Sequence, residues 1–347
     1  MRPINDMPIS YLSSLNKERI ESSFSMAAKR YDRFAVLQKE VAGELQKLVV
    51  ISSEFIERKP STAISELRTP NSQLLILDIG CGTGFLTHGL THALPEANVF
   101  GCDISHAMVK VTSCKLPVAR DKKMRLLTAD CGALPYKDKI FDRVASNLTY
   151  QWIHDIKTAF SEAYRVLRPG GIFIFSTLGP ETLKELRHCY IEASSRFNRN
   201  GLPPFMGFSD KQMLQSALEN AGFKNISIKK ANVIKTYPDM WALLRAMKSI
   251  GAGNPFKDGD KSLARGSLLK NMAEVYREKF GVRSSELGVK DKSKFSELLT
   301  TNYELYKLRT VKSPNSQLST PNCIYATYEV IFVCGKKEKA LNGKNEQ

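Results

Sequence analysis

Residues 74–84 read Leu-Leu-Ile-Leu-Asp-Ile-Gly-Cys-Gly-Thr-Gly, and this stretch decides the fold of the chain. A short apolar run, typical of a buried strand, leads directly into three glycines spaced two residues apart. Glycine lets the backbone turn sharply and lets a ligand approach without obstruction by a Cβ atom. A helical pattern of apolar residues begins at Phe85, directly after the loop. The stretch therefore predicts a ligand site at the carboxyl end of the first strand of an open α/β sheet.

Two common phosphate-binding loops fit this stretch poorly. The dinucleotide fingerprint Gly-x-Gly-x-x-Gly places its third glycine where this chain has Phe85, which weakens the interpretation as an NAD site. A P-loop requires Gly-Lys-Ser/Thr, and no such triplet follows Gly84. We therefore expect a small anionic or zwitterionic ligand at residues 80–84.

The flanking sequence alternates short apolar runs with helical patterns, which indicates a parallel sheet with right-handed crossovers. Strands are predicted at 74–79, 98–102, 124–129, 143–146 and 172–177, after Gly222, and at 324–333. Helices are predicted at 16–31, 36–50, 85–94, 105–112, 155–167, 181–195, 210–220, 237–250 and 262–280. Residues 168–171, Arg-Pro-Gly-Gly, are expected to stop one helix, and Ser209 is expected to cap the helix at 210–220.

Polar residues follow three further predicted strands. Asp103 comes nineteen residues after Gly84, where an acidic side chain can accept two hydrogen bonds from a ribose diol. Asp130, followed by Cys131, ends the third strand, where a carboxylate can hold an adenine amino group. Asn147 ends the fourth strand, where we expect the reacting end of the ligand. Such residues at four successive strand ends favour a ligand site over helix capping alone.

Composition bounds the class of protein. The chain has 347 residues, 42% of them apolar and 25% charged, which is typical of a globular protein. No apolar run reaches about 18 residues, and the first residues lack an apolar segment behind a basic start, so we expect neither a membrane span nor a secretory signal. The seven cysteines form no Cys-x-x-Cys pair. We therefore expect no metal site and a cytoplasmic location.

The formal net charge is +16, from 51 Lys and Arg against 35 Asp and Glu. A field of this size attracts anions and raises their association rates. Nucleic acid, an anionic membrane and an acidic carrier protein would all benefit from this charge, and a plain solvated basic surface explains it as well. The charge alone therefore does not name a partner.

With these motifs the chain resembles the class I S-adenosylmethionine-dependent methyltransferases. Their loop Asp-x-Gly-x-Gly-x-Gly matches residues 78–84, and their ribose and adenine acids match Asp103 and Asp130. The resemblance implies S-adenosyl-L-methionine as the cofactor and a Rossmann-like α/β fold, with a mostly parallel seven-stranded sheet whose last strand is antiparallel. The implied cofactor-binding residues are Asp78, Gly80, Cys81, Gly82, Gly84, Asp103, Asp130, Cys131 and Asn147.

A second set of motifs is similar to the biotin-pathway malonyl-acyl-carrier-protein O-methyltransferases, over about residues 17–335. These motifs are Phe24 to Ala28 with Tyr31-Asp32, Asn147 with Gln151-Trp152, Ser176 to Gly179 with Thr182-Leu183 and Glu185-Leu186, Met247 to Gly253, and Ala326-Thr327-Tyr328. The polar segments at 52–73 and 308–322 depart from the family pattern. The resemblance implies methylation of the free carboxylate of a malonyl thioester on an acyl-carrier protein.

The implied acceptor needs no general base, because a carboxylate is already ionised at neutral pH. We therefore expect catalysis by alignment and water exclusion, with no catalytic acid or base residue. None of the five histidines, at positions 88, 92, 106, 154 and 188, is expected to be catalytic.

Four residues are expected to bind the substrate. Arg187 is the first choice for the malonyl carboxylate, because a guanidinium holds a carboxylate with two hydrogen bonds. A solvated helix face, or an ion pair with a neighbouring glutamate, would explain Arg187 equally well. Tyr31 is expected to close over the methionine end of the cofactor, and Gln151 and Trp152 are expected to lie beside the transferred methyl group.

Arg245 and Lys248 are second choices for binding either the substrate or the carrier. The carrier would be acidic and would bear malonyl-phosphopantetheine, which makes the positive charge of the chain intelligible. We expect the protein to be a monomer that binds no membrane, and nucleic acid is disfavoured.

The predicted organisation is one methyltransferase domain at 16–335 between an N-terminal tail at 1–15 and a C-terminal tail at 336–347. Within the domain, N-terminal helices span 16–50 and the sheet core spans 74–230 and 324–334. An inserted helical cover with a loop spans 237–322 and is expected to lie over the mouth of the sheet.

Two other functions stay open. A methyltransferase acting on RNA or on another protein suits the basic charge. However, amino-methylating enzymes carry Asn/Asp-Pro-Pro-Tyr/Phe where this chain has Asn-Leu-Thr-Tyr at 147–150. A non-catalytic assembly factor with a methyltransferase fold is the other possibility, and the intact glycine loop with Asp103 argues against it.

Overall fold

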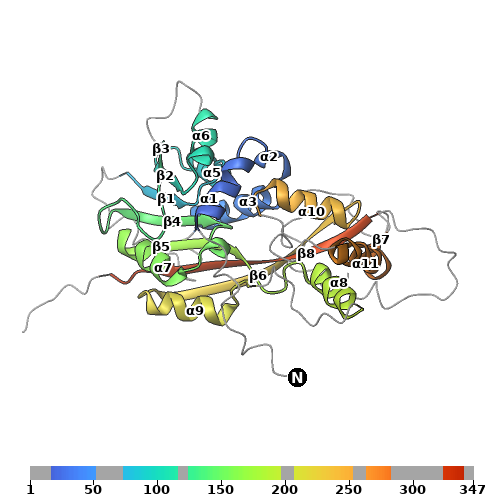
Figure 1. Ribbon diagram of the computed structural model, residues 1–347. Coiled ribbons are helices and arrows are strands. Elements are labelled where there is room, and N and C mark those ends of the chain that lie inside the picture. The colour runs from blue at the N-terminus through green and yellow to red at the C-terminus, as the bar shows by residue number, and fades with distance from the viewer. Residues whose placement is uncertain are drawn as a thin grey trace, which may run out of the picture.

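The computed structural model describes residues 17–51, 73–115, 124–196, 207–252, 263–282 and 323–339, which form an open sheet with helices on both faces (Figure 1). The helices are α1 (Lys17–Ala27), α2 (Tyr31–Phe34), α3 (Val36–Val50), α5 (Phe85–Ala93), α6 (His106–Cys114), η4 (Tyr150–Trp152), α7 (Ile156–Val166), α8 (Lys184–Ser195), α9 (Lys211–Asn220), α10 (Met240–Ser249) and α11 (Leu263–Phe280). The strands are β1 (Leu75–Ile79), β2 (Asn98–Asp103), β3 (Met124–Thr128), β4 (Phe141–Asn147), β5 (Leu167–Leu178), β6 (Lys224–Tyr237), β7 (Gly281–Val282) and β8 (Cys323–Lys336).

The strand order is β3-β2-β1-β4-β5-β8-β6, with β7 paired to β8. Strands β1 to β5 are mutually parallel where they pair, and β8 runs antiparallel to both β5 and β6. The predicted α/β class with an antiparallel last strand is therefore confirmed. The predicted count of seven strands holds for the long strands, and the two-residue β7 makes an eighth in the described part of the chain.

Alternate residues of the central strands pack on opposite faces of the sheet, as the pleat of a strand requires. On β5, Ile174 joins the core shared with α3, α5 and α8, whereas Phe173 and Phe175 join the core shared with α7. The Phe160 ring of α7 lies 5.7 Å from the Phe173 ring and 5.3 Å from the Phe175 ring, measured between centroids. Burial on both faces explains why these strands are continuous apolar runs in the sequence.

The N-terminal helix predicted at 16–31 is wrong in its extent, because α1 ends at Ala27 and a turn separates it from α2. The helix predicted from residue 181 begins at Lys184, because Leu183 has a φ of 55° and belongs to a turn. The cap of α9 is Asp210 and not Ser209, since Asp210 Oδ1 accepts a hydrogen bond from the Met213 amide at 2.8 Å.

The sheet core extends further along the chain than residue 230. β6 continues past residue 230 to Tyr237, paired with β8 along its length, so the insertion begins only at α10. Of the inserted helices, α10 lies beside α2, whereas α11 packs against α8 and β8 and supports the sheet edge (Figure 1). The predicted cover is therefore limited to α10 among the described helices.

Several predictions lie outside the described residues: the tail at 1–15, the polar segment at 52–72, the loop at 308–322 and the C-terminal tail beyond Lys339. Within the described residues, no helix is long and apolar enough to cross a membrane, and no three potential metal ligands gather.

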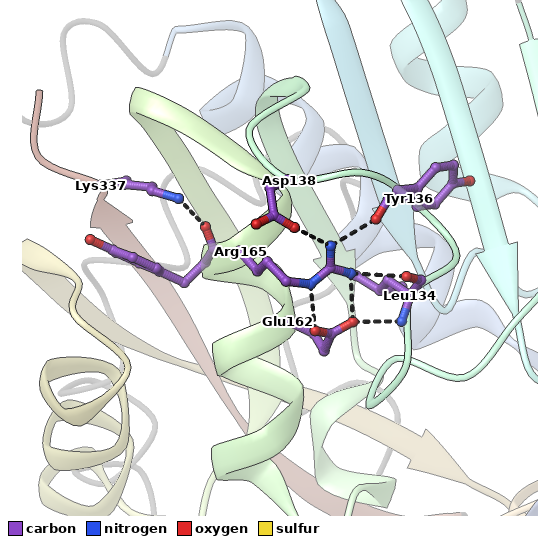
Figure 2. Close-up of polar contacts among 7 residues, drawn as sticks. Leu134, Tyr136, Asp138, Glu162, Arg165 and Lys337 are labelled. Carbon is purple, nitrogen blue, oxygen red and sulfur yellow. Dashed lines mark hydrogen bonds and ion pairs between the residues drawn. The ribbon is translucent and has the colours of Figure 1, made fainter. Parts of the chain in front are cut away.

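One polar cluster ties the loop between β3 and β4 to helix α7 (Figure 2). The Arg165 guanidinium donates to Glu162 at 2.7 and 2.8 Å and to Asp138 at 2.7 Å. It also donates to the carbonyls of Tyr136 at 2.7 Å and Leu134 at 2.9 Å. The Arg165 hydrogen bonds hold the pKa of Glu162 below its usual value, against the opposing effect of burial.

We predict that Arg165→Ala lowers the free energy of unfolding by about 2 kcal/mol, because two carboxylates and two carbonyls lose the hydrogen bonds from the guanidinium, and Glu162 keeps only the one from the Leu134 amide. Urea unfolding followed by circular dichroism measures the change. Arg196→Ala is the matched control: that side chain is 48% exposed and lies 3.6 Å from Glu192, so its loss is expected to cost less than about 0.5 kcal/mol. Equal losses in the two variants would contradict the role assigned to Arg165.

Candidate functional site

The glycine loop lies between β1 and α5, where the strand order reverses between β2 and β4 on either side of β1. Gly80 has a φ of 70°, and a Cβ atom there would lie 2.3 Å from Thr149 Oγ1. No larger residue fits at this position. The amides of Gly80 and Cys81 donate to the Cys102 carbonyl at 2.7 and 2.9 Å, which fixes the loop on the end of β2.

A pocket opens beside this loop, at the carboxyl edge of the sheet where α/β proteins bind ligands. It is lined by Tyr31, Gln38, Asp78, Gly80, Cys81, Gly82, Thr83, Phe85, Leu86 and Asn147. The predicted residues Tyr31, Asp78 and Asn147 therefore meet at one place, although they come from α2, β1 and β4.

Asp78 is buried in the wall of the pocket. Its Oδ2 accepts a hydrogen bond from Thr87 Oγ1 at 2.6 Å, whereas its Oδ1 has no partner among the described residues. Burial raises the pKa of Asp78 to about 7, with a further contribution from Asp103, and the Thr87 hydrogen bond only partly opposes this. A buried carboxylate oxygen without a donor suits a cationic group on a ligand.

Asp103 connects the glycine loop to the end of β2. Its Oδ2 accepts from the Gly82 amide at 2.9 Å and its Oδ1 accepts from the Ser105 amide at 2.8 Å. Burial raises its pKa in spite of these two hydrogen bonds. Because each carboxylate oxygen has two lone pairs, Asp103 retains the capacity to accept further hydrogen bonds from hydroxyl groups.

Asp130 lies just beyond β3 and is one-third exposed. Its Oδ1 accepts from the Gly132 amide at 3.1 Å, and its Oδ2 pairs with Lys17 of α1. Burial opposes ionisation of Asp130, but the hydrogen bonds from Lys17 and Gly132 outweigh it and lower the pKa.

Cys131 and Cys81 are buried; burial raises the pKa of Cys131 to about 12 and that of Cys81 well above its usual value. Both are neutral thiols at physiological pH and therefore poor nucleophiles.

The Asn147 side chain uses both ends of its amide. Its Nδ2 donates to the Gln38 carbonyl at 3.0 Å, and its Oδ1 accepts from Ser176 Oγ at 2.9 Å. These bonds connect α3, β4 and β5 at the pocket wall. Asn147 thus fixes the shape of the pocket as well as lining it.

Helices α1 and α2, residues 17–34, pack over the carboxyl edge of the sheet, and we call them the N-terminal lid (Figure 1). Thr83 Oγ1, in the glycine loop, donates to Asp32 Oδ1 at 2.5 Å. Lys115 pairs with Asp32 Oδ2 and also donates to the Thr83 carbonyl at 2.7 Å. Ser25 Oγ lies 2.8 Å from Ser105 Oγ. Polar contacts therefore attach the lid directly to the loops that form the pocket.

An aromatic group continues the lid towards η4. The Phe24 ring lies 6.5 Å from the Tyr31 ring and 5.3 Å from the Trp152 ring, between centroids. Tyr31 also lies 6.5 Å from Phe85, and burial, with the nearby Asp103 and Asp32 charges, raises its pKa well above the usual range. Gln151 accepts a hydrogen bond from Thr177 Oγ1 at 3.3 Å.

Arg187 lies on α8 and does not line the pocket beside the glycine loop. Its Nη2 donates to the carbonyls of Pro180 and Thr182, and its buried Nε has no partner among the described residues. Desolvation lowers the pKa of Arg187, although the charges of Glu181 and Glu185 oppose this effect. A partly buried guanidinium with an unused donor is suited to bind an anion.

The sequence alone did not point to Gln38 or Lys115 as parts of this site. Lys115 contacts Asp32 across more than eighty residues of chain, and no local pattern marks such a pair. Asp32 stands beside Tyr31 in a quoted motif, but its role as the anchor of the lid becomes visible only in the fold.

Comparison with known proteins places these residues in context. A family model described as a methyltransferase domain matches residues 77–175, which include the glycine loop and the ends of β2, β3 and β4. A malonyl-[acyl-carrier protein] O-methyltransferase of Geobacter sulfurreducens is 31% identical over 77% of this chain and 93% of that protein. One from Halorhodospira halophila is 33% identical over 76% of this chain and 81% of that protein.

A biotin biosynthesis bifunctional protein BioHC of Saccharophagus degradans is 33% identical over 76% of this chain, but the match spans only 43% of that longer protein. The similarity to the two shorter relatives, in contrast, extends over most of their length. Because these two relatives are more than 30% identical to this chain over most of their own length, the chain belongs to the malonyl-[acyl-carrier protein] O-methyltransferase family of class I S-adenosylmethionine-dependent methyltransferases.

Proposed function

We propose that this protein uses S-adenosyl-L-methionine to methylate the free carboxylate of a malonyl group carried as a thioester on acyl-carrier protein, a step in biotin biosynthesis. The observation that carries the proposal is the similarity to relatives named for this reaction, over 93% of the length of one of them. The site is consistent with it, since it combines a cofactor pocket with a partly buried arginine at the same edge of the sheet.

The pocket residues fit the cofactor by their chemistry. The unpartnered Asp78 Oδ1 would accept a hydrogen bond from the ammonium group in the methionine part of the cofactor. Asp103, beside the glycine loop, would accept hydrogen bonds from the ribose hydroxyls. Asp130, just beyond β3, would accept a hydrogen bond from the adenine amino group. At Gly80, Gly82 and Gly84 the loop would present backbone to the cofactor without a Cβ atom in the way. When bound, the cofactor supplies a methyl group that its sulfonium makes electrophilic.

The protein has little proton chemistry to perform, because the malonyl carboxylate is already ionised at neutral pH. We assign the carboxylate to Arg187, whose buried Nε is available as a donor. Phe24, Tyr31 and Trp152 of the aromatic group would keep water away from the reacting atoms. Alignment of an ionised acceptor in a site closed to water is worth several kcal/mol of the barrier.

We also propose that the carrier is acidic, that the protein works as a monomer and that it acts in the cytoplasm. The net charge of +16 supports an acidic partner. The six cysteines at positions 81, 102, 114, 131, 189 and 334 are free thiols, as is usual in a reducing compartment.

We predict that Asp103→Ala weakens S-adenosylmethionine binding by about tenfold to a hundredfold, because hydrogen bonds to a charged group contribute about 1.5–3 kcal/mol. Isothermal titration calorimetry measures the affinity. Asp155→Ala is the matched control, since Asp155 also accepts an amide hydrogen bond, from Thr158 at 3.0 Å, but caps α7. Unchanged affinity in Asp103→Ala would reject the cofactor assignment.

The acceptor is tested with labelled cofactor and two thioesters of the same carrier. We expect base-labile label on malonyl-carrier protein and none on acetyl-carrier protein, because only the malonyl group has a free carboxylate. Label on tRNA, with none on malonyl-carrier protein, would favour the nucleic-acid alternative instead.

We predict that Arg187→Gln raises KM for malonyl-carrier protein and malonyl-coenzyme A alike by about tenfold or more, since both present the same carboxylate. Steady-state kinetics measure this, and Arg196→Gln, on the exposed end of the same helix, is the control. If Arg187→Gln is silent with both substrates, the carboxylate is held elsewhere.

A further inference from the structure

The surfaces of the N-terminal lid and of α10 combine exposed cations with exposed apolar side chains. Lys29, Arg30 and Arg33 are exposed on the N-terminal lid, and Arg245 and Lys248 are exposed on α10. The two elements adjoin: α10 contacts α2, and a Cβ atom on Gly251, just beyond α10, would lie 3.0 Å from the Phe24 ring (Figure 1). We call these five residues and their two elements the α2–α10 face.

The cations of this face are mostly uncompensated. Among the described residues, Lys29, Arg30 and Lys248 make no ion pair, and the Arg245 side chain is 70% exposed with its nearest carboxylate, Asp239, at 3.9 Å. The acid nearest to them on the lid, Asp32, is already paired with Lys115. Two lysines of β6 differ, since Lys230 pairs with Glu329 and Lys235 with Glu40.

Apolar groups accompany these charges. Seven large apolar side chains are exposed in the described residues: Met26, Phe34, Val36, Ile51, Ile191, Met213 and Trp241. Met26 and Phe34 belong to the lid and Trp241 to α10, with exposed fractions of 71%, 37% and 37%. On α10, Trp241, Arg245 and Lys248 follow the i, i+4, i+7 spacing of one helix face. Aromatic, methionine and arginine side chains together are typical of protein interfaces.

The position of the face relates it to the reaction. Tyr31, two residues before Arg33 on α2, lines the cofactor pocket. A partner docked on this face would therefore stand beside the entrance through which a flexible thioester arm has to pass. Its phosphodiester and acidic side chains would meet the unpaired cations, and its apolar side chains would meet Phe34 and Trp241.

We propose that the α2–α10 face is the docking surface for the acidic acyl-carrier protein, an inference that rests on the proposed function. Exposed charges act mainly through steering, over about 8–10 Å at physiological salt. Docking therefore governs association of the carrier and leaves the chemistry of the malonyl group unchanged.

The experiment compares two substrates with the same acyl group: malonyl-carrier protein and malonyl-pantetheine, which lacks both the protein surface and the phosphates. Arg33→Glu, Arg245→Glu and Lys248→Glu are each expected to raise KM for the carrier substrate by about fivefold. KM for malonyl-pantetheine and kcat for both substrates are expected to stay within about twofold. Lys211→Glu, on the remote helix α9, is the matched charge reversal and is expected to change neither substrate (Figure 1).

Changing an acidic residue of the carrier to lysine should return the KM of the Glu variants towards that of the unmodified enzyme. Such a rescue would not occur if the substitutions had simply unfolded the enzyme. Equal effects on both substrates, or an equal effect of Lys211→Glu, would overturn the proposal. A lower mass of the Glu variants in sedimentation would also overturn it, because the face would then join two copies of this chain. No activity of the unmodified protein on either malonyl thioester would instead refute the proposed function.

Discussion

The carboxylate of Asp103 accepts hydrogen bonds from the amides of Gly82 and Ser105, and the site depends on this interaction. It fastens the glycine loop after β1 to the end of β2, so two neighbouring strands present one continuous edge. Because the strands are parallel, the residues that follow β3 and β4 reach the same edge. The cost is a buried carboxylate, whose pKa is raised by desolvation. Asp78 adds a second buried carboxylate with an oxygen that no described residue satisfies. Burial therefore disfavours the ionised forms of both carboxyl groups, and a positively charged ligand group beside them would favour ionisation.

The N-terminal lid completes the pocket from outside the sheet. It contributes Tyr31 to the lining, and Asp32 anchors it to Thr83 and Lys115. The same short helix carries Arg33 on its outer surface. One element therefore combines a residue that lines the pocket with an exposed cation on its outer surface. A large partner bound to this outer surface would lie close to the pocket without entering it.

Other buried polar groups stabilise this edge of the sheet without lining the pocket. Glu185 of α8 accepts from the Thr327 amide at 3.0 Å and from its hydroxyl at 2.5 Å. Glu329 of β8 accepts from the Glu181 amide at 3.0 Å and pairs with Lys230. These contacts hold the turn between β5 and α8, and with it the backbone carbonyls that Arg187 contacts. Glu185 of α8 and Glu329 of β8 thus fix the turn beside Arg187, whereas Asp78 and Asp103 lie beside the glycine loop.

The sequence by itself determined the α/β class, the glycine loop and the acids at the strand ends, because strand burial, loop geometry and chain order leave local patterns. A family motif also drew attention to Tyr31, which lines the pocket in the structure. The tertiary structure alone decided which distant groups meet: Lys115 with Asp32, Lys17 with Asp130, and Gln38 with Asn147. It alone showed that β6 extends to Tyr237 and that Asp210 caps α9, because both follow from pairing and hydrogen bonding. Contacts between elements depend on how faces pack, and single side chains such as Lys115 carry no periodic signal of their partner.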